Sequence, residues 1–369
     1  MQRCSPDDQK ENPDSLAGEI GVQGVEALPG RVARYSKAKS SALDVAEYMA
    51  GQPGLQETAK RVASCGDYLV FRHYFTVDEV KLHGAQLCMK SLLCPLCAIR
   101  RGAKALKSYL DRWECIRVEK TLLRPFLVTL TVKDGDDLDE RFRHLHAAQR
   151  ELWKRKQRAR GSVLDGVVGA VWSYEVKRGS GSGKWHPHLH MIALAEVQPD
   201  QASLSDEWRQ ITGDSFIVDV RPIEQDDPVS GFLEVFKYAV KFSEQEPADT
   251  VHAFRVLKGR RLIGSAGVFR NVEMTPDLLD SESEALQELP FITLFYRYLR
   301  GGYSLEWQKH GQDFPVSTPA DKPVKPLDLD RLARAETARR RTGEVIDARA
   351  AERRSLAELR QRFNLLEGR

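Results

Sequence analysis

Apolar and polar residues alternate along several short stretches of the chain, and this period of two predicts β-strands. The clearest stretch is 124–132, in which four apolar side chains point to one side and the hydroxyls of Thr129 and Thr131 to the other. We expect the apolar side to face helices.

Further strands are expected at 68–75, 167–177, 183–194 and 214–220. Helical periodicity appears in three longer stretches, which are 138–160, 201–213 and 229–244. Together these segments predict an α+β fold, in which a central antiparallel sheet has helices on one face and the functional site on the other.

Composition divides the chain into four regions. Residues 1–57 are polar and acidic, and we expect a largely disordered segment with at most one short helix at 41–50. The cysteines concentrate in 58–110, which predicts a small metal-binding module ahead of the main domain. Residues 111–311 contain most of the predicted strands and helices, and 312–369 read as a proline-rich linker followed by a charged helix.

The formal net charge is only +3 over 369 residues, which by itself does not indicate a nucleic-acid partner. A hydrophobic content of 41% is enough for an ordinary core. No apolar run approaches the ~20 residues of a membrane-spanning helix, and the polar N-terminal segment has none of the features of a signal peptide. We therefore expect a cytoplasmic protein without a membrane partner.

Three histidines share one face of the strand predicted within 183–194. They are His186, His188 and His190. Imidazole is a common metal ligand, and a His-x-His pair on a strand points two rings at one site. The glycine-rich hairpin at 178–184 is expected to place Glu175 opposite Pro187, beside two of these rings. The pattern predicts an open cation site made by a carboxylate and two histidines, and incidental surface histidines are the alternative.

Four of the six cysteines lie between residues 65 and 97. They are Cys65, Cys88, Cys94 and Cys97. The Cys-Pro-Leu-Cys spacing lets two thiolates bind one tetrahedral ion, and four thiolates complete a structural zinc site. In a reducing cytosol, such a cluster is more often a metal site than a disulfide framework. Four reduced core cysteines are the alternative, and His73 or His83 would substitute for a cysteine that is not a ligand.

A basic amphipathic helix is expected to follow the cysteines, at 98–110. Its cations are Arg100, Arg101, Lys104 and Lys107. We expect these side chains to contact DNA phosphates. A solvated charged face would give the same pattern.

The helix predicted at 229–244 carries three polar residues whose side chains could take part in catalysis. At ~100° per residue, Glu234, Tyr238 and Lys241 fall on one stripe. Phe232, Val235, Phe236 and Ala239 lie roughly opposite and are expected to pack on the sheet. An ordinary amphipathic helix is the alternative.

In their order along the chain, three of these motifs resemble those of the HUH endonucleases. The closest resemblance is to the single-tyrosine rolling-circle replication initiators of small bacterial plasmids. The motifs are the threonine-containing strand at 126–132, the His188-Leu-His190 pair and the helix at 235–241. The upstream cysteine pattern and the stretch 208–218 are also similar. The resemblance covers about residues 60–305 and identifies 111–311 as a HUH nicking endonuclease domain.

The resemblance implies a role for each matching residue. His188 and His190 would bind Mg2+ or Mn2+, and Tyr238 would be the nucleophile. Glu234 would activate water in the closing cleavage, and Lys241 matches the lysine of the motif. Glu175 as a third cation ligand depends on the hairpin geometry rather than on the family pattern, and His186 receives no role.

The implied activity is nicking and rejoining of single-stranded DNA. Attack by tyrosine would leave a 5′-phosphotyrosine and a free 3′-OH that primes a host polymerase. The expected partners are plasmid origin DNA, single-stranded or in a hairpin, together with a host helicase and DNA polymerase. No oligomeric state is indicated. The alternatives are a transposase or conjugative relaxase of the same superfamily, and a zinc-dependent DNA-binding regulator with an inactive site.

Overall fold

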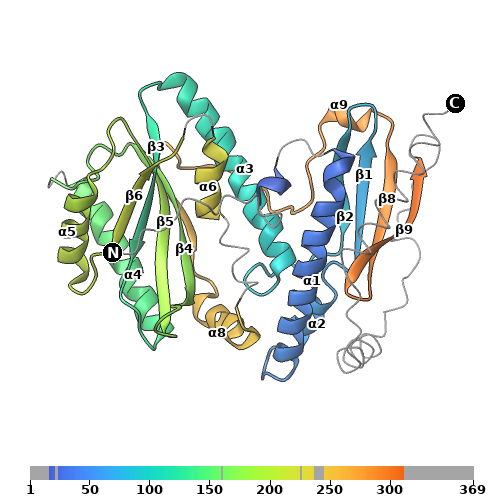
Figure 1. The fold of residues 1–369 in the computed structure, drawn as a ribbon, viewed down its shortest axis with the longest axis horizontal. Helices are drawn as coiled ribbons and strands as arrows, with labels where there is room; N and C mark the ends of the chain where they lie inside the picture. Colours follow the sequence, from blue (N-terminus) through green and yellow to red (C-terminus); the bar gives the residue numbers. More distant parts are fainter. Residues whose placement is uncertain (1–15, 21–23, 159–160, 225–226, 237–244, 311–369) are drawn as a thin grey trace.

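The computed structural model describes residues 16–20, 24–158, 161–224, 227–236 and 245–310. These residues form two antiparallel sheets joined by helices, which confirms the predicted α+β class. The predicted central antiparallel sheet corresponds to the five-stranded sheet, and the second, four-stranded sheet was not predicted. Figure 1 shows the five-stranded sheet on the left, the four-stranded sheet on the right, and helix α3 (Pro95–Glu119) between them.

The five-stranded sheet has helices on both faces, which corrects the prediction of helices on one face only. Its strands in spatial order are β6 (Val218–Pro222), β3 (Arg124–Thr131), β5 (Trp185–Ala195), β4 (Gly169–Arg178) and β7 (Ile263–Gly267). The apolar side chains of β3 pack against α4 (Leu138–Gln157) and α5 (Gln201–Thr212), as predicted. The opposite face packs against α6 (Pro228–Phe236), through Ile192 and Leu194 of β5.

The four-stranded sheet combines two strands that precede α3 with two strands at the C-terminal end of the described residues. Its strands in order are β2 (Glu79–Ala85), β1 (Tyr68–Tyr74), β8 (Ile292–Leu299) and β9 (Gly302–His310). Its inner face packs on α1 (Leu28–Ala50) and α3. Because β1 pairs with β8, residues 58–110 do not form a separate module, which corrects that part of the fold prediction.

Helix α1 contradicts the expectation of disorder for most of residues 1–57. It has 23 residues, and side chains such as Tyr35 and Met49 are fully buried against the four-stranded sheet and α3. The remaining elements are η1 (Leu16–Glu19), η2 (Val25–Ala27), α2 (Gln56–Ala63), α8 (Pro247–Leu257) and α9 (Glu284–Gln287). One continuous apolar core runs from α1 through α3 to the α6 face of the five-stranded sheet, so the two sheets are packed together rather than tethered.

A buried ion network joins the N-terminal segment to α3 and to the loop before α9. Glu19 accepts hydrogen bonds from Arg31 Nε at 3.2 Å and from Arg100 Nη1 at 2.9 Å. Asp280 accepts from Arg31 Nη2 at 2.9 Å and from the Leu82 N–H at 2.6 Å. Arg100 is 1% exposed and enclosed by carboxylates, so the expectation that it contacts DNA phosphates is wrong.

Acid is expected to weaken this network. Burial acts to raise the pKa of Asp280, but the charges of Arg100 and Arg31 outweigh it and hold that pKa well below its usual range. Burial also acts to raise the pKa of Glu19, but the charges of Arg31 and Arg100 outweigh it and the pKa is lowered. Both carboxyls therefore stabilise the fold fully above the unfolded pKa of about 4, and this contribution is lost as the pH falls. Urea denaturation should show the free energy of unfolding falling by on the order of 2 kcal/mol between about pH 6 and pH 3.

A Glu19→Gln variant separates this network from the other carboxyls. At neutral pH the variant should be less stable than the wild type, because it leaves Arg31 and Arg100 with less compensating charge. The difference should shrink as the pH falls, since Glu19 itself becomes protonated. A difference that stays constant with pH would contradict the prediction.

Candidate active site

The histidine strand β5 lies in the middle of the five-stranded sheet, between β3 and β4. His188 pairs with Glu175 on β4, and His190 pairs with Ser173. The sequence placed Glu175 opposite Pro187, one residue away. The register differs because the hairpin closes between Arg178 and Trp185 rather than symmetrically about Gly181.

Glu175, His188 and His190 converge on one point. One oxygen of Glu175, Oε2, lies 3.1 Å from His188 Nε2 and 3.1 Å from His190 Nε2. The three residues are 2%, 5% and 9% exposed, and their ligand atoms all lie within 4.8 Å of one another. Two imidazole nitrogens and a carboxylate oxygen suit a divalent cation such as Mn2+, so the residues present fit the implied metal.

The second nitrogen of each ring is also engaged. His188 Nδ1 lies 3.3 Å from the backbone oxygen of His186, and His190 Nδ1 lies 3.2 Å from Thr129 Oγ1. Contacts of this kind fix the ring orientation and leave Nε2 to the metal. Burial lowers the pKa of His188 despite the neighbouring carboxylate of Glu175, so its neutral, metal-binding form is favoured at neutral pH.

Replacing Thr129 with valine is expected to weaken Mn2+ binding about tenfold, because the His190 ring loses the partner that orients it. Isothermal titration calorimetry measures this affinity. Thr131→Val is the matched control, since its hydroxyl lies on the same strand and donates to the Ile217 carbonyl at 2.8 Å instead. An equal loss in both variants would assign the effect to the strand and not to His190.

His186 stands apart from the three converging groups. Its Nδ1 lies 2.6 Å from Asp134 Oδ1, in the turn that follows β3. Its ring centroid lies 5.4 Å from that of His188, so the imidazole borders the site without joining the cluster. No pattern in the sequence indicated that Asp134 would engage His186.

Helix α6 covers the histidine face of the sheet. Phe232, Val235 and Phe236 are buried against it, as predicted from the sequence. The Ser173 hydroxyl donates to the Val235 carbonyl at 2.5 Å, which ties the end of α6 to the strand beside His190.

Glu234 lies on α6 and is half-buried. Tyr238, Lys241 and Ala239 fall outside the described residues, as does the rest of the helix predicted to residue 244. The chain resumes at Gln245, whose Nε2 donates to the Val176 carbonyl on β4 at 2.5 Å. Both described ends of this segment are thus anchored to β4.

Aromatic rings hold α6 against α3 and against the segment after β7. Tyr109 of α3 stacks on Phe236 at 5.3 Å between ring centroids, and Phe269 contacts Tyr109 at 5.8 Å. Phe232 meets Phe269 at 6.2 Å. This cluster joins α6 to α3 and to the segment after β7.

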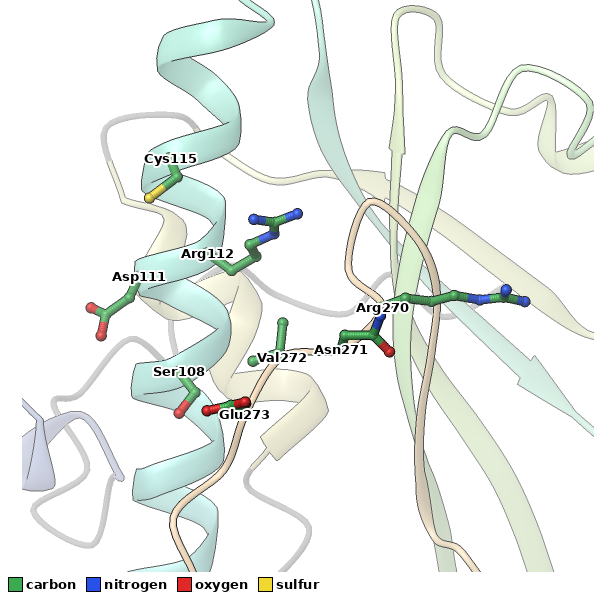
Figure 2. Close-up of a pocket in the computed structure, with 8 residues that line it drawn as sticks. All are labelled: Ser108, Asp111, Arg112, Cys115, Arg270, Asn271, Val272 and Glu273. Atoms are coloured by element: carbon green, nitrogen blue, oxygen red, sulfur yellow. The ribbon is translucent and has the colours of Figure 1, made fainter.

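A polar groove of about 540 Å³ lies between α3 and residues 270–273. Figure 2 shows Arg112 and Asp111 on the helix and Arg270 and Glu273 on the opposing segment. Its charges are mixed, and none of its lining residues belongs to the histidine cluster. The groove therefore does not define the active site.

The four cysteines predicted to bind zinc form a second cluster. Cys65 precedes β1, Cys88 follows β2, and Cys94 and Cys97 open α3. All four are buried, and Cys65 Sγ lies 3.4 Å from Cys94 Sγ and 3.5 Å from Cys97 Sγ. Zinc–sulfur bonds of about 2.3 Å in a tetrahedron place the sulfurs about 3.8 Å apart, so the cluster fits a zinc ion.

The chemistry of the cluster also fits an ion. Hydrogen bonding to Cys65 and to the other two thiols, together with burial, raises the pKa of Cys94 well above its usual value. A bound cation is what would stabilise the thiolate form of such a group. His73 and His83, the substitute ligands, contact Asp78 and Glu282 instead.

The other predicted DNA-binding cations lie along α3. Arg101 and Lys107 are exposed, and Lys107 pairs with Asp111 at 2.8 Å. Lys104 is half-buried and donates to Ser281 Oγ at 3.2 Å, and burial lowers its pKa.

Among the described residues, no helix is both long enough and apolar enough to cross a lipid bilayer.

Comparison with known proteins defines the class to which this chain belongs. A family model described as "Replication protein" matches residues 79–290, more than half of the chain. The chain therefore belongs to this family of replication proteins. The match includes both strands of the histidine cluster and three of the four cysteines.

Two curated relatives carry the name "Protein rep". One, from a Bacillus species, is 24% identical over 275 residues, which cover 65% of this chain and 87% of the relative. The other, from Streptococcus pneumoniae, is 26% identical over 252 residues, which cover 62% of this chain and 76% of the relative. No solved structure matches.

Proposed function

We propose that this chain initiates rolling-circle replication of a plasmid by nicking single-stranded origin DNA with Tyr238. The observation that carries the proposal is the convergence of His188 and His190 on one oxygen of Glu175, on the sheet face that α6 covers. Such a cluster would serve as the cation site of a HUH nicking enzyme. Membership in a family of replication proteins supports the same role.

The sequence around Tyr238 supports its assignment as the nucleophile. The Val235 carbonyl accepts a hydrogen bond from the hydroxyl of Ser173, which is the strand partner of His190. Three residues of chain span at most about 11 Å. Tyr238 follows this anchor by three positions in the sequence, which supports its assignment as the proposed nucleophile.

In the proposed reaction, the Tyr238 phenol loses its proton and its oxygen attacks the scissile phosphorus. The 3′-oxygen leaves and takes up a proton, so that the products are a 5′-phosphotyrosine and a free 3′-OH. A divalent cation at the histidine cluster would offset charge on the phosphate and orient it for in-line attack. Because free tyrosine has a pKa of about 10, a neighbouring cation such as Lys241 would favour the phenolate.

The covalent step conserves the energy of the broken bond until termination. A host helicase and polymerase would extend the free 3′-OH, and a later 3′-OH could then displace Tyr238 and rejoin the strand. Glu234, at the end of α6, would activate water for the closing cleavage and release the enzyme.

A direct test incubates the full-length protein with a single-stranded oligonucleotide of the plasmid origin and Mn2+. We expect a covalent protein–DNA adduct on a denaturing gel, located at Tyr238 by mass spectrometry. Tyr238→Phe should form no adduct while still binding the oligonucleotide.

Two outcomes would contradict the proposal. Persistence of the adduct in Tyr238→Phe would assign the nucleophile elsewhere. Tight origin binding with no adduct under any divalent cation would identify the chain as a zinc-dependent DNA-binding regulator instead.

A further inference from the structure

The four-stranded sheet has one face packed on helices and one face turned outward. Leu69, Phe71 and Leu294 point inward to α1 and α3. In Figure 1 these helices lie on the side of the sheet toward the rest of the protein. The residues that alternate with them, including Tyr68 and Phe295, belong to neither apolar core.

Three aromatic rings form a ladder across this outer face. Tyr68 of β1 stacks on Phe295 of β8 at 5.8 Å between centroids, with 16° between the ring planes. Phe295 stacks in turn on Trp307 of the edge strand β9, at 5.1 Å and 2°. Phe295 is covered by its two neighbours, whereas Trp307 is 41% exposed. The ladder therefore ends in a large indole that still offers surface to a further flat ring.

Basic residues flank the ladder on both sides. The strand register pairs Thr293 with Lys309 on one side of it and Tyr68 with Arg297 on the other. Residues two apart on a strand are about 7 Å apart, and both Lys309 and Arg297 are exposed.

Paired charges lie at the opposite edge of the same face, on β1, β2 and the loop before α9. There Glu79 pairs with Lys81, and Glu282 pairs with Arg72 at 2.9 Å. The β8–β9 half contributes the cations Arg297 and Lys309, together with one exposed acid, Glu306 of β9.

We propose that the outer face of β8 and β9 binds single-stranded DNA, with a base stacked on Trp307 and phosphates at Arg297 and Lys309. Stacking surfaces bordered by cations are how proteins hold single strands without reading their sequence. An apolar protein partner would use the rings but would gain little from the flanking cations. In duplex DNA the base faces are already stacked on each other, so we expect the surface to prefer single strands.

This inference rests on the proposed function, because it supplies a second contact for the DNA that the histidine site would nick. The contact is distinct from that site, which lies on the other sheet. A strand held at both places would stay with the protein after nicking.

The test measures binding of a labelled single-stranded oligonucleotide by fluorescence anisotropy, in full-length protein carrying Tyr238→Phe. This background prevents reaction, so the result is independent of whether the wild type nicks DNA. Adding Trp307→Ala should weaken binding about tenfold. Tyr48→Ala, which removes a 38% exposed aromatic side chain on α1, is the matched control and should change nothing.

The phosphate contacts have their own readout. Arg297→Ala should reduce the slope of log affinity against log salt by about 0.7, the value for one lost contact to a single strand. Arg117→Ala, at an exposed position on α3, should leave the slope unchanged. An unchanged slope in Arg297→Ala would overturn the phosphate assignment.

Photocrosslinking covers the case in which Trp307→Ala destabilises the sheet. A bromodeoxyuridine oligonucleotide should crosslink to the peptide that contains Trp307 in otherwise unmodified protein. Crosslinks confined to other peptides, or wild-type affinity in a folded Trp307→Ala variant, would overturn the proposal.

Discussion

Replacing His190 with glutamine is expected to lower the rate of origin nicking by at least about 100-fold. Loss of a contact that only orients a metal ligand typically costs 10-fold to about 100-fold in metal affinity or activity. His190 is placed to be a ligand itself, with Nε2 3.1 Å from Glu175 and beside His188. Its loss should therefore reach at least the upper end of that range.

Glutamine is chosen because it retains volume and a polar group near Thr129, so the buried strand should keep its packing. Mn2+ affinity from calorimetry and the rate of adduct formation should fall together. His144→Gln is the control, since this histidine lies on α4 and contacts Asp214 rather than the cluster. Nicking by His190→Gln at the wild-type rate would exclude His190 as a ligand of a cation that is needed for nicking.

Replacing Cys94 with serine is expected to remove bound zinc and to lower the free energy of unfolding by about 4 kcal/mol or more. The binding free energy of a structural zinc ion is part of the folding free energy of the site that holds it. Loss of a metal is among the few single changes that exceed about 4 kcal/mol. Here the ion would join β1, β2 and α3 at one point, so its loss should affect all three.

Elemental analysis should find about one zinc per chain in the wild type and less in Cys94→Ser. Urea denaturation gives the change in stability. Cys115→Ser is the matched control, because this cysteine is exposed near the other end of α3. Wild-type protein that is free of zinc and as stable as Cys94→Ser would refute the assignment.

Local patterns in the sequence predicted the residues that meet at the histidine cluster. The period of two placed His188 and His190 on one face, and the glycine-rich hairpin brought Glu175 to them, whereas the contact of Thr129 with His190 was not predicted. The pairing was misjudged by one residue, because composition does not fix where a six-residue loop closes. The short cysteine spacings likewise indicated neighbours that the fold brings into contact.

Features that depend on distant partners could not be predicted in this way. The β1–β8 pairing joins residues more than 200 positions apart, and no local pattern indicates it. Helix α1 was mistaken for disorder because its buried face includes charged residues such as Arg31, whose partner Asp280 lies 249 positions away. Arg100 was assigned to the surface for the same reason, since its enclosure depends on Glu19 and Asp280.

Helix α3 connects the cysteine cluster to helix α6. Cys97 lies in its first turn, and Tyr109, twelve residues on, stacks against Phe236 at the end of α6. A helix rises about 1.5 Å per residue, so the two contacts are about 18 Å apart on one stiff rod. Loss of the metal or oxidation of the thiols at the start of α3 would therefore disturb the Tyr109–Phe236 contact. That contact lies at the end of α6, two residues before Tyr238 in the sequence. Replication would then depend on the metal and redox state of the cell through a helix that contributes no residue to the histidine cluster.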